Sequence, residues 1–134
     1  MHAKTSYSTA ELTQALTQLF ERNDTSAIRP MLREDLTLKL PASLPYGGEF
    51  TGIKPFEDLF VGPPGGDAVW ESFDIRVDRV IEADGYLVVQ LTDTVIPRAT
   101  GRQKVIHNLW LFEITAGRIS QAQLYADTAA ATGA

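Results

Sequence analysis

The chain has 134 residues, of which 44% are hydrophobic and 22% are charged, and its formal net charge at pH 7 is −5. This length predicts one domain, residues 1–134, with room for a core and a modest cavity. The acidic balance and the lack of a basic stripe argue against a nucleic-acid partner. The absence of cysteine excludes disulfides, thiol nucleophiles and thiolate metal sites.

The sequence gives no sign of export or membrane insertion. Residues 1–7 lack the apolar region of a signal peptide, and no apolar run is long enough to span a bilayer. Because cysteine is also absent, we expect a cytoplasmic protein with no membrane partner.

The first part of the chain predicts helices. Ser8 and Glu11 have the spacing of a capping box, and apolar residues then recur at helical spacing up to Asn23. A second, short helix is expected over residues 24–32. A third is expected over residues 53–60, with a proline in its first turn. These segments predict three helices before the apolar spacing changes.

The second half of the chain predicts strands, because apolar residues there alternate with polar ones. Asp84-Gly85 and Ala116-Gly117 are typical of tight hairpin turns. The alternation slips near Asp78-Arg79, which predicts a β-bulge. Residues 41–50 hold two prolines and two glycines and are expected to form a loop. The expected strands cover residues 36–40, 70–82, 86–96, 105–114 and 118–126.

The last hairpin carries a family resemblance. Trp110-Leu111-Phe112, then Gly117-Arg118-Ile119 and the ending Tyr125-Ala126-Asp127-Thr128 resemble the end of the nuclear transport factor 2-like (NTF2-like) superfamily. Residues 36–41 and 45–52 resemble the first strand and the following loop of its SnoaL-like members. The superfamily includes ketosteroid isomerase, limonene-epoxide hydrolase and SnoaL-like polyketide cyclases. The resemblance covers nearly the whole chain.

Helices followed by antiparallel strands indicate an α+β fold. The resemblance implies a cone-shaped, curved, mixed but mostly antiparallel sheet wrapped around three N-terminal helices, an arrangement also called cystatin-like. It further implies that a small hydrophobic molecule binds in the cone. Because this fold hosts many unrelated functions, the residues of the cavity decide the chemistry.

The acid–base groups of ketosteroid isomerase are missing from this sequence. The positions of its tyrosine and first aspartate fall on or near Leu16 and on Leu40, and that of its strand acid falls near Asn108 or Trp110. Leucine cannot carry a proton between two atoms of a substrate. The resemblance therefore does not extend to this isomerase mechanism.

The epoxide-hydrolase constellation is also incomplete. Its arginine and two aspartates fall on Leu91, Asp93 and Leu124, so only Asp93 remains. Asp93 shares a strand face with apolar neighbours, and burial in a cavity would raise the pKa of its carboxyl group. The alternative is that Asp93 faces solvent or pairs with Arg98 or Arg102.

The alternation of strand 105–114 divides its candidate residues between two faces. Asn108 shares a face with Trp110 and Phe112, where it could orient a carbonyl or hydroxyl group of a ligand. His107 lies on the other face with two leucines; it could act as an acid or base, but a structural role is favoured. That apolar outer row predicts a homodimer formed by outer sheet faces.

The final strand and one loop complete the candidate site. Ala122 and Leu124 share an apolar face, and the small alanine beside large aromatic rings predicts empty space for a ligand. Asp127 is a candidate acid, although a carboxylate there more simply anchors the tail. Tyr46 could either line the mouth of the cavity or plug it.

The sequence therefore predicts a protein that binds a small hydrophobic or polycyclic molecule. It leaves open whether the protein is an isomerase, cyclase or hydrolase that uses acid–base chemistry or a non-catalytic binding or dimerisation module. A carboxylate or histidine buried in the cavity wall would favour an enzyme. No metal or cofactor motif is recognised. The catalytic candidates are Asp93, His107 and Asp127, and the ligand-binding candidates are Tyr46, Asn108, Trp110, Phe112, Ala122, Leu124, Leu16 and Leu40.

Overall fold

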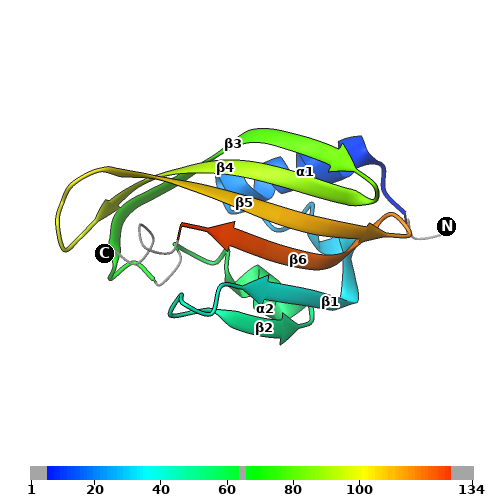
Figure 1. Cartoon of the computed structure of the whole chain (residues 1–134), viewed down its shortest axis with the longest axis horizontal. Helices are drawn as coiled ribbons and strands as arrows, with labels where there is room; N and C mark the ends of the chain where they lie inside the picture. Colours follow the sequence, from blue (N-terminus) through cyan, green and yellow to red (C-terminus); the bar gives the residue numbers. More distant parts are fainter. Residues whose placement is uncertain (1–5, 64–65, 128–134) are drawn as a thin grey trace.

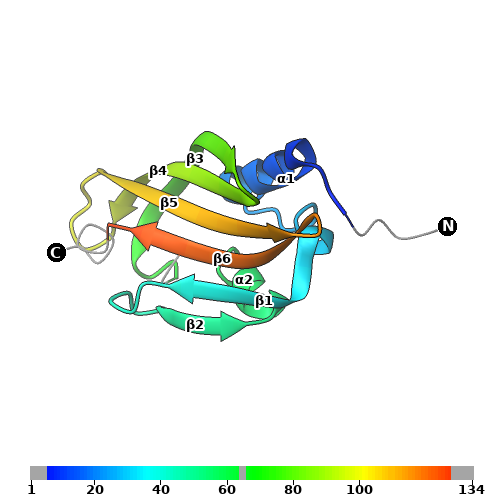
Figure 2. The same ribbon diagram turned by 45° about the vertical axis from the view of Figure 1, so that its right-hand side comes forward.

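The computed structural model describes residues 6–63 and 66–127. Six strands form one sheet in the order β2-β1-β6-β5-β4-β3, in which β1 and β6 run parallel and every other neighbouring pair is antiparallel. The sheet is curved, and both α-helices lie on the same side of it (Figures 1 and 2). The elements are α1 (Thr9–Arg22), the 3₁₀ turn η1 (Arg29–Met31), β1 (Leu32–Leu40), β2 (Gly48–Thr51), α2 (Ile53–Asp58), β3 (Trp70–Ala83), β4 (Tyr86–Pro97), β5 (Lys104–Thr115) and β6 (Arg118–Ala126).

The first helix forms as its sequence predicts. The Ser8 hydroxyl accepts a hydrogen bond from the Glu11 amide, and the Glu11 carboxylate accepts one from the Ser8 amide. Asn23 ends α1 in the left-handed region, with φ of 54°, which asparagine tolerates better than most residues. Because its apolar stripe is buried, α1 packs along the inner side of the sheet near β3.

The expected set of three helices is wrong. The described residues contain only two α-helices, α1 and α2, since residues 24–32 form turns and the short η1 instead of a helix. Pro30 lacks an amide proton and η1 is only three residues long, so no α-helical ladder develops. Part of the expected loop 41–50 is also a strand, because β2 pairs antiparallel with β1 at the sheet edge.

The hairpins follow the expected pattern. Residues 84–85 and 116–117 have positive φ at both central positions, which matches the twist of the strands they join. The register between β3 and β4 shifts between Val77 and Arg79, so the predicted bulge at Asp78 is confirmed. The bulge turns the Asp78 side chain toward the outer face, where it meets Thr92 of β4.

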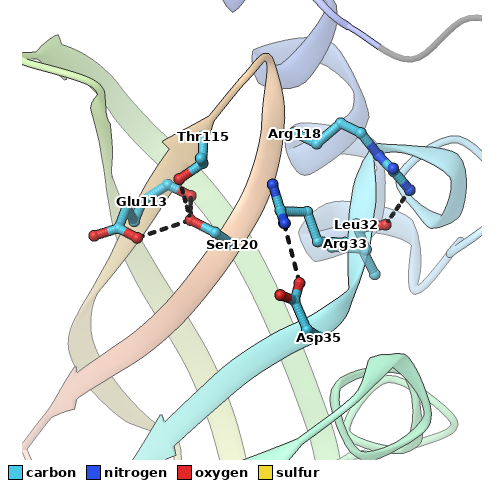
Figure 3. A network of polar contacts seen from close by, with 7 residues as sticks. All are labelled: Leu32, Arg33, Asp35, Glu113, Thr115, Arg118 and Ser120. Atoms are coloured by element: carbon cyan, nitrogen blue, oxygen red, sulfur yellow. Dashed lines mark hydrogen bonds and ion pairs between the residues drawn. The ribbon is translucent and has the colours of Figure 1, made fainter.

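Polar contacts fix the start of β6 against its neighbours (Figure 3). The Ser120 hydroxyl contacts the Glu113 carboxylate at 2.8 Å and the Thr115 hydroxyl at 2.8 Å, beside a register shift in the last hairpin. Arg118 donates a hydrogen bond of 2.8 Å to the carbonyl of Leu32, where the parallel pairing of β1 and β6 begins. The Ser120 contacts therefore join β6 to β5, and the Arg118 contact joins β6 to β1 in the one parallel pair of the sheet.

The core lies between the helices and the concave side of the sheet. Its centre is an aromatic cluster in which the rings of Trp110 and Phe112 stack with centroids 5.7 Å apart. Phe20 of α1 and Phe56 and Phe60, from α2 and the turn after it, pack around this pair. A second, smaller cluster of Trp70, Val95 and Ile106, with Phe73 packed against it, lies toward the other end of the strands.

Neither helix in the described part of the chain has the length and hydrophobicity needed to cross a membrane.

Candidate functional site

A cavity of about 400 Å³ lies on the helix side of the sheet, and members of both aromatic clusters line it. This volume suits a small organic molecule. Its apolar walls include Phe20, Phe60, Trp70, Phe73, Trp110, Leu40, Leu91, Ile106 and Leu124, and its polar lining includes Tyr46, Asp93 and Asn108.

Asp93 of β4 is the buried carboxylate of this cavity. It is only 3% exposed, and it lies on the inner face of β4 because residue 92 and residue 93 point to opposite sides of the sheet. Burial raises the pKa of the Asp93 carboxyl group to about 7, against a smaller lowering effect of the hydrogen bond from Asn108. The interpretations that Asp93 faces solvent or pairs with Arg98 or Arg102 are therefore wrong.

Asn108 of β5 is the direct partner of Asp93. Its side-chain amide donates a hydrogen bond to Asp93 Oδ2 across the β4–β5 pairing. The remaining side-chain oxygens, Asp93 Oδ1 and Asn108 Oδ1, are buried and have no hydrogen-bond partner among the described residues. Two buried acceptors without donors are energetically unfavourable, and both oxygens are able to accept hydrogen bonds from a bound molecule.

Tyr46 reaches the cavity from the loop between β1 and β2. The loop folds tightly, and a Cβ atom on Gly47 would lie 1.9 Å from the Pro41 carbonyl oxygen, so only glycine fits there. Burial, and then the nearby Asp93 charge, raise the pKa of the Tyr46 hydroxyl. Tyr46 is therefore a neutral hydrogen-bonding group close to the carboxylate.

The other candidates separate into cavity and core. Trp110 and Leu124 line the cavity, as the alternation predicts, and so does Leu40, a candidate from the family resemblance. Leu16, Phe112 and Ala122 are fully buried on the same side of the sheet, but they belong to the packed core and do not line the cavity. Alternation identifies the inner face correctly, but it does not tell which positions along that face are packed against helices.

His107 and Asp127 lie away from the cavity. His107 is exposed on the outer face, where its Nδ1 is 3.4 Å from the hydroxyl of Thr92. Thr92 in turn donates a hydrogen bond to Asp78, and this bond is the main cause of the lowered pKa of the Asp78 carboxyl group. Asp127 is exposed just after β6 and does not line the cavity.

Several lining residues were not anticipated from the sequence. Trp70 begins β3, and its ring meets that of Phe73 edge-on at 5.1 Å, which walls one end of the cavity. Phe20 and Phe60 add aromatic surface from the helical side. The sequence shows two large aromatic residues, Trp70 and Phe73, at the start of a strand, but only the three-dimensional structure shows that they line the same cavity as Asp93.

The described residues contain no group of three or more histidine, aspartate or glutamate side chains placed to hold a metal ion. The polar part of the cavity is instead a carboxyl, an amide and a phenol. These groups accept, donate and transfer protons.

A curved sheet of this order, with helices on its concave side and a cavity beneath, defines the nuclear transport factor 2-like fold. The SnoaL-like domain family matches residues 13–122, and the chain belongs to this family. None of the curated proteins compared with the chain matches it.

Solved structures show the same fold at low sequence identity. A nuclear transport factor 2-like protein of unknown function from Burkholderia pseudomallei is 20% identical, with 92% of this chain and 94% of that chain covered and a TM-score of 0.75. TerC, crystallised with polyporic acid, is 18% identical, with 92% and 95% covered and a TM-score of 0.73. A protein from Catenulispora acidiphila with a ketosteroid isomerase-like fold, in complex with trimethylamine, is 15% identical, with 88% and 86% covered and a TM-score of 0.66.

Proposed function

We propose that this protein binds a small, mainly apolar molecule in the cavity and catalyses proton transfer on it. Asp93 is the general acid–base, and Asn108 and Tyr46 orient the substrate. The reaction class is isomerisation or cyclisation through proton removal beside a carbonyl group. The observation that supports this proposal most strongly is Asp93 itself, a carboxyl group that is buried in the cavity wall and has no cationic partner among the described residues.

The environment of Asp93 suits this role. A general base works best when its pKa is near the working pH, and burial raises the pKa of Asp93 to about 7. The hydrogen bond from Asn108 holds Asp93 Oδ2 in place. Because the carboxyl group is rigid, this contact also fixes the position of Asp93 Oδ1. Structural carboxylates are usually ion-paired, whereas this one is not.

The proton transfer balances within the site. Asp93 takes a proton from a carbon atom next to the carbonyl, so the C–H bond breaks and an O–H bond forms on the carboxyl group. The electron pair moves into an enolate, whose oxygen can accept a hydrogen bond from the Tyr46 hydroxyl. For an isomerisation, Asp93 then returns the proton at another atom. For a cyclisation, the enolate carbon attacks a second carbonyl carbon of the same molecule, the C=O π electrons move to its oxygen, and this oxygen takes the proton from Asp93.

The comparisons support small-molecule binding without indicating the reaction. Two neighbours with this fold were crystallised with small molecules, trimethylamine in one and polyporic acid in the other. The aromatic walls of the cavity in this chain fit the same general use, because they exclude water and strengthen electrostatic interactions inside.

Hydrogen–deuterium exchange on a model ketone tests the proposal. We expect the protein to accelerate deuterium incorporation from D₂O at the α-carbons of 2-tetralone, followed by NMR. Asp93→Asn removes the base and keeps the shape, so it should lower the rate by at least about 100-fold. Asp58→Asn, an exposed position on α2 paired with Lys54, is the matched control and should leave the rate unchanged.

The pH dependence gives a second readout of the same reaction. Because the ionised carboxylate is the base, the rate should rise with pH up to about 7 and level off above it. An exchange rate that does not depend on Asp93, or no exchange above the buffer rate, would contradict the proposal. In that case the second candidate, a non-catalytic binding module, is favoured by the loss of both familiar constellations at Leu16, Leu40 and Leu91.

A further inference from the structure

The polar wall of the cavity offers acceptors that lack donors. Asp93 Oδ1 and Asn108 Oδ1 are both buried without a hydrogen-bond partner among the described residues. Asp93 is 3% exposed, so water from the bulk does not reach it freely. A ligand that complements this wall must bring hydrogen-bond donors, because a ligand with acceptors only would leave both oxygens unpaired.

The charged residues around the cavity are mostly acidic. Besides Asp93, four exposed acidic residues line it, and Arg22 is the only basic residue in the lining among the described residues. One oxygen of Glu21 accepts a hydrogen bond of 3.0 Å from the Val77 amide, which holds that carboxylate in place. Acidic groups at a cleft entrance attract cations and repel anions. The four exposed acidic residues are Glu21, Asp67, Glu71 and Asp74.

The apolar walls of the cavity are rich in aromatic rings. Trp110, Trp70, Phe20, Phe60 and Phe73 all line it. The faces of aromatic rings carry partial negative charge, so they attract a cation placed within about 6 Å of the ring centre. Walls of this kind bind an apolar cation better than a neutral molecule of the same shape.

These three features exclude other classes of ligand. An anion such as a carboxylate or phosphate would meet an acidic entrance and a buried carboxylate with a single exposed arginine to offset them. A neutral hydrocarbon would satisfy the aromatic walls and leave the two acceptors unpaired. An amine cation with an apolar body satisfies the acceptors, the aromatic rings and the charge together.

We propose that the ligand of this cavity is an apolar amine in its cationic form, whose ammonium group donates hydrogen bonds to Asp93 and Asn108 while its body packs against Trp110 and the neighbouring rings. This inference rests on the proposed function in one respect, since it assigns Asp93 to the ligand site. An ammonium group beside Asp93 also keeps the carboxylate ionised, which is the form that acts as a base.

Binding should therefore be linked to the protonation of Asp93. Below pH 7 the carboxyl group must lose its proton before it can pair with the cation. The affinity for an amine should rise with pH up to about 7 and then stay constant until the amine itself loses its proton. The polar neighbours of Asp93 are Asn108 of β5 and Tyr46 of the β1–β2 loop, and neither is expected to titrate in this range. The other charged groups of the cavity lining are Glu21 and Arg22 of α1, Asp67 before β3, and Glu71 and Asp74 of β3.

Three probes of similar shape separate charge from hydrogen bonding. Benzylamine carries a cationic donor, benzyl alcohol a neutral donor and ethylbenzene neither. Both tryptophans of the chain, Trp70 and Trp110, line the cavity, so quenching of tryptophan emission reports binding of all three. We expect benzylamine to bind at least about tenfold more tightly than benzyl alcohol, and benzyl alcohol more tightly than ethylbenzene.

Variants assign the preference to Asp93. Asp93→Asn should abolish the advantage of benzylamine and leave the affinity for ethylbenzene unchanged, whereas Asp58→Asn should behave as wild type. Since a buried substitution can disturb folding, the pH dependence in the wild-type protein is an independent measurement. Benzylamine affinity should increase about tenfold per pH unit below 7, and benzyl alcohol affinity should not increase.

The outcomes distinguish this inference from the proposed function. If benzyl alcohol binds as well as benzylamine while 2-tetralone exchange still depends on Asp93, the cationic ligand is excluded and the catalytic proposal remains. If benzylamine is preferred but no exchange occurs, the cavity is a binding site for amines and the catalytic proposal falls. If no probe binds and no exchange occurs, both are wrong.

Discussion

At the scale of single residues, the proposed function depends on Asp93. Its carboxyl group is only 3% exposed, and among the described residues it accepts a hydrogen bond from the side-chain amide of Asn108. Burial favours the neutral carboxyl group, so the folded protein binds this proton more tightly than the unfolded chain does. A polar group kept in an unfavourable state is typical of active sites, where stability is lost in exchange for reactivity.

This residue predicts a specific dependence of stability on pH. A rise of the Asp93 pKa from 3.8 to about 7 means that the folded state loses stability between these values, by up to about 4 kcal/mol above pH 7. Asp93→Asn cannot ionise, so the difference in unfolding free energy between this variant and wild type should grow from pH 4 to pH 8 and then remain constant. Urea unfolding at several pH values measures it, and a constant difference would contradict the burial of an ionisable Asp93.

At the scale of elements, one strand serves both core and cavity. On the inner face of β6, Ala122 pairs with Phe112 in the packed core, while Ala126 pairs with Asn108 and lines the cavity. The two alanines lie four residues apart on the same face and differ only in what covers them. The cavity therefore lies at the Ala126 end of β6, and the packed core lies at the Ala122 end.

The two alanines therefore form a matched pair for mutation. Ala126→Trp should fill the cavity beside Asn108, weaken benzylamine binding by at least about tenfold and leave the fold intact, because Ala126 is not fully buried. Ala122→Trp should instead destabilise the protein by about 1–3 kcal/mol or more, since it overpacks the core. Thermal melting and probe binding of both variants test this, and equal effects of the two substitutions would show that the cavity extends to Ala122.

The elements show what the sequence could and could not predict. The capping box at Ser8, the bulge at Asp78 and the two hairpin turns depend on local chemistry, and all were predictable. The assignment of Asn108 and Trp110 to the inner face followed from alternation along β5. The helix expected over residues 24–32 does not form, because Pro30 and the neighbouring turns leave a segment too short for α-helical hydrogen bonding.

The candidate site was less predictable than the fold, for a physical reason. Whether Asp93 is buried depends on the packing of α1, the β1–β2 loop and β3 over β4, and these contacts are distant in sequence. The same applies to Phe112 and Ala122. Alternation correctly predicts that they lie on the inner face, but the prediction that they line the cavity is wrong. Alternation gives the side of a strand, but helices decide which part of that side is filled.

At the scale of the whole molecule, the outer face of the sheet is uncovered. Both helices lie on the concave side, and no described element covers the opposite face of β4, β5 and β6 (Figures 1 and 2). Val105 and Tyr125 are 53% and 51% exposed there, next to the partly buried Leu109 and Leu111. An apolar face of this kind is typical of an interface between subunits.

We therefore expect a homodimer in which two outer sheet faces pack together. Leu109→Glu introduces a charge on this face, away from the cavity, and should shift the protein to monomer without changing the exchange rate of 2-tetralone. Sedimentation of wild type and variant at micromolar concentration measures the assembly. A wild-type monomer at that concentration would contradict the prediction.

The most direct test of the central claim is the titration of Asp93 itself. The carboxyl carbon of this residue can be followed by ¹³C NMR as the pH of the ligand-free protein is raised, with its resonance assigned by comparison with Asp93→Asn. We predict a midpoint near pH 7, because the carboxyl group is buried in the cavity wall without a cationic partner among the described residues. A midpoint near 3.8, the value of an ordinary exposed aspartate, would contradict it.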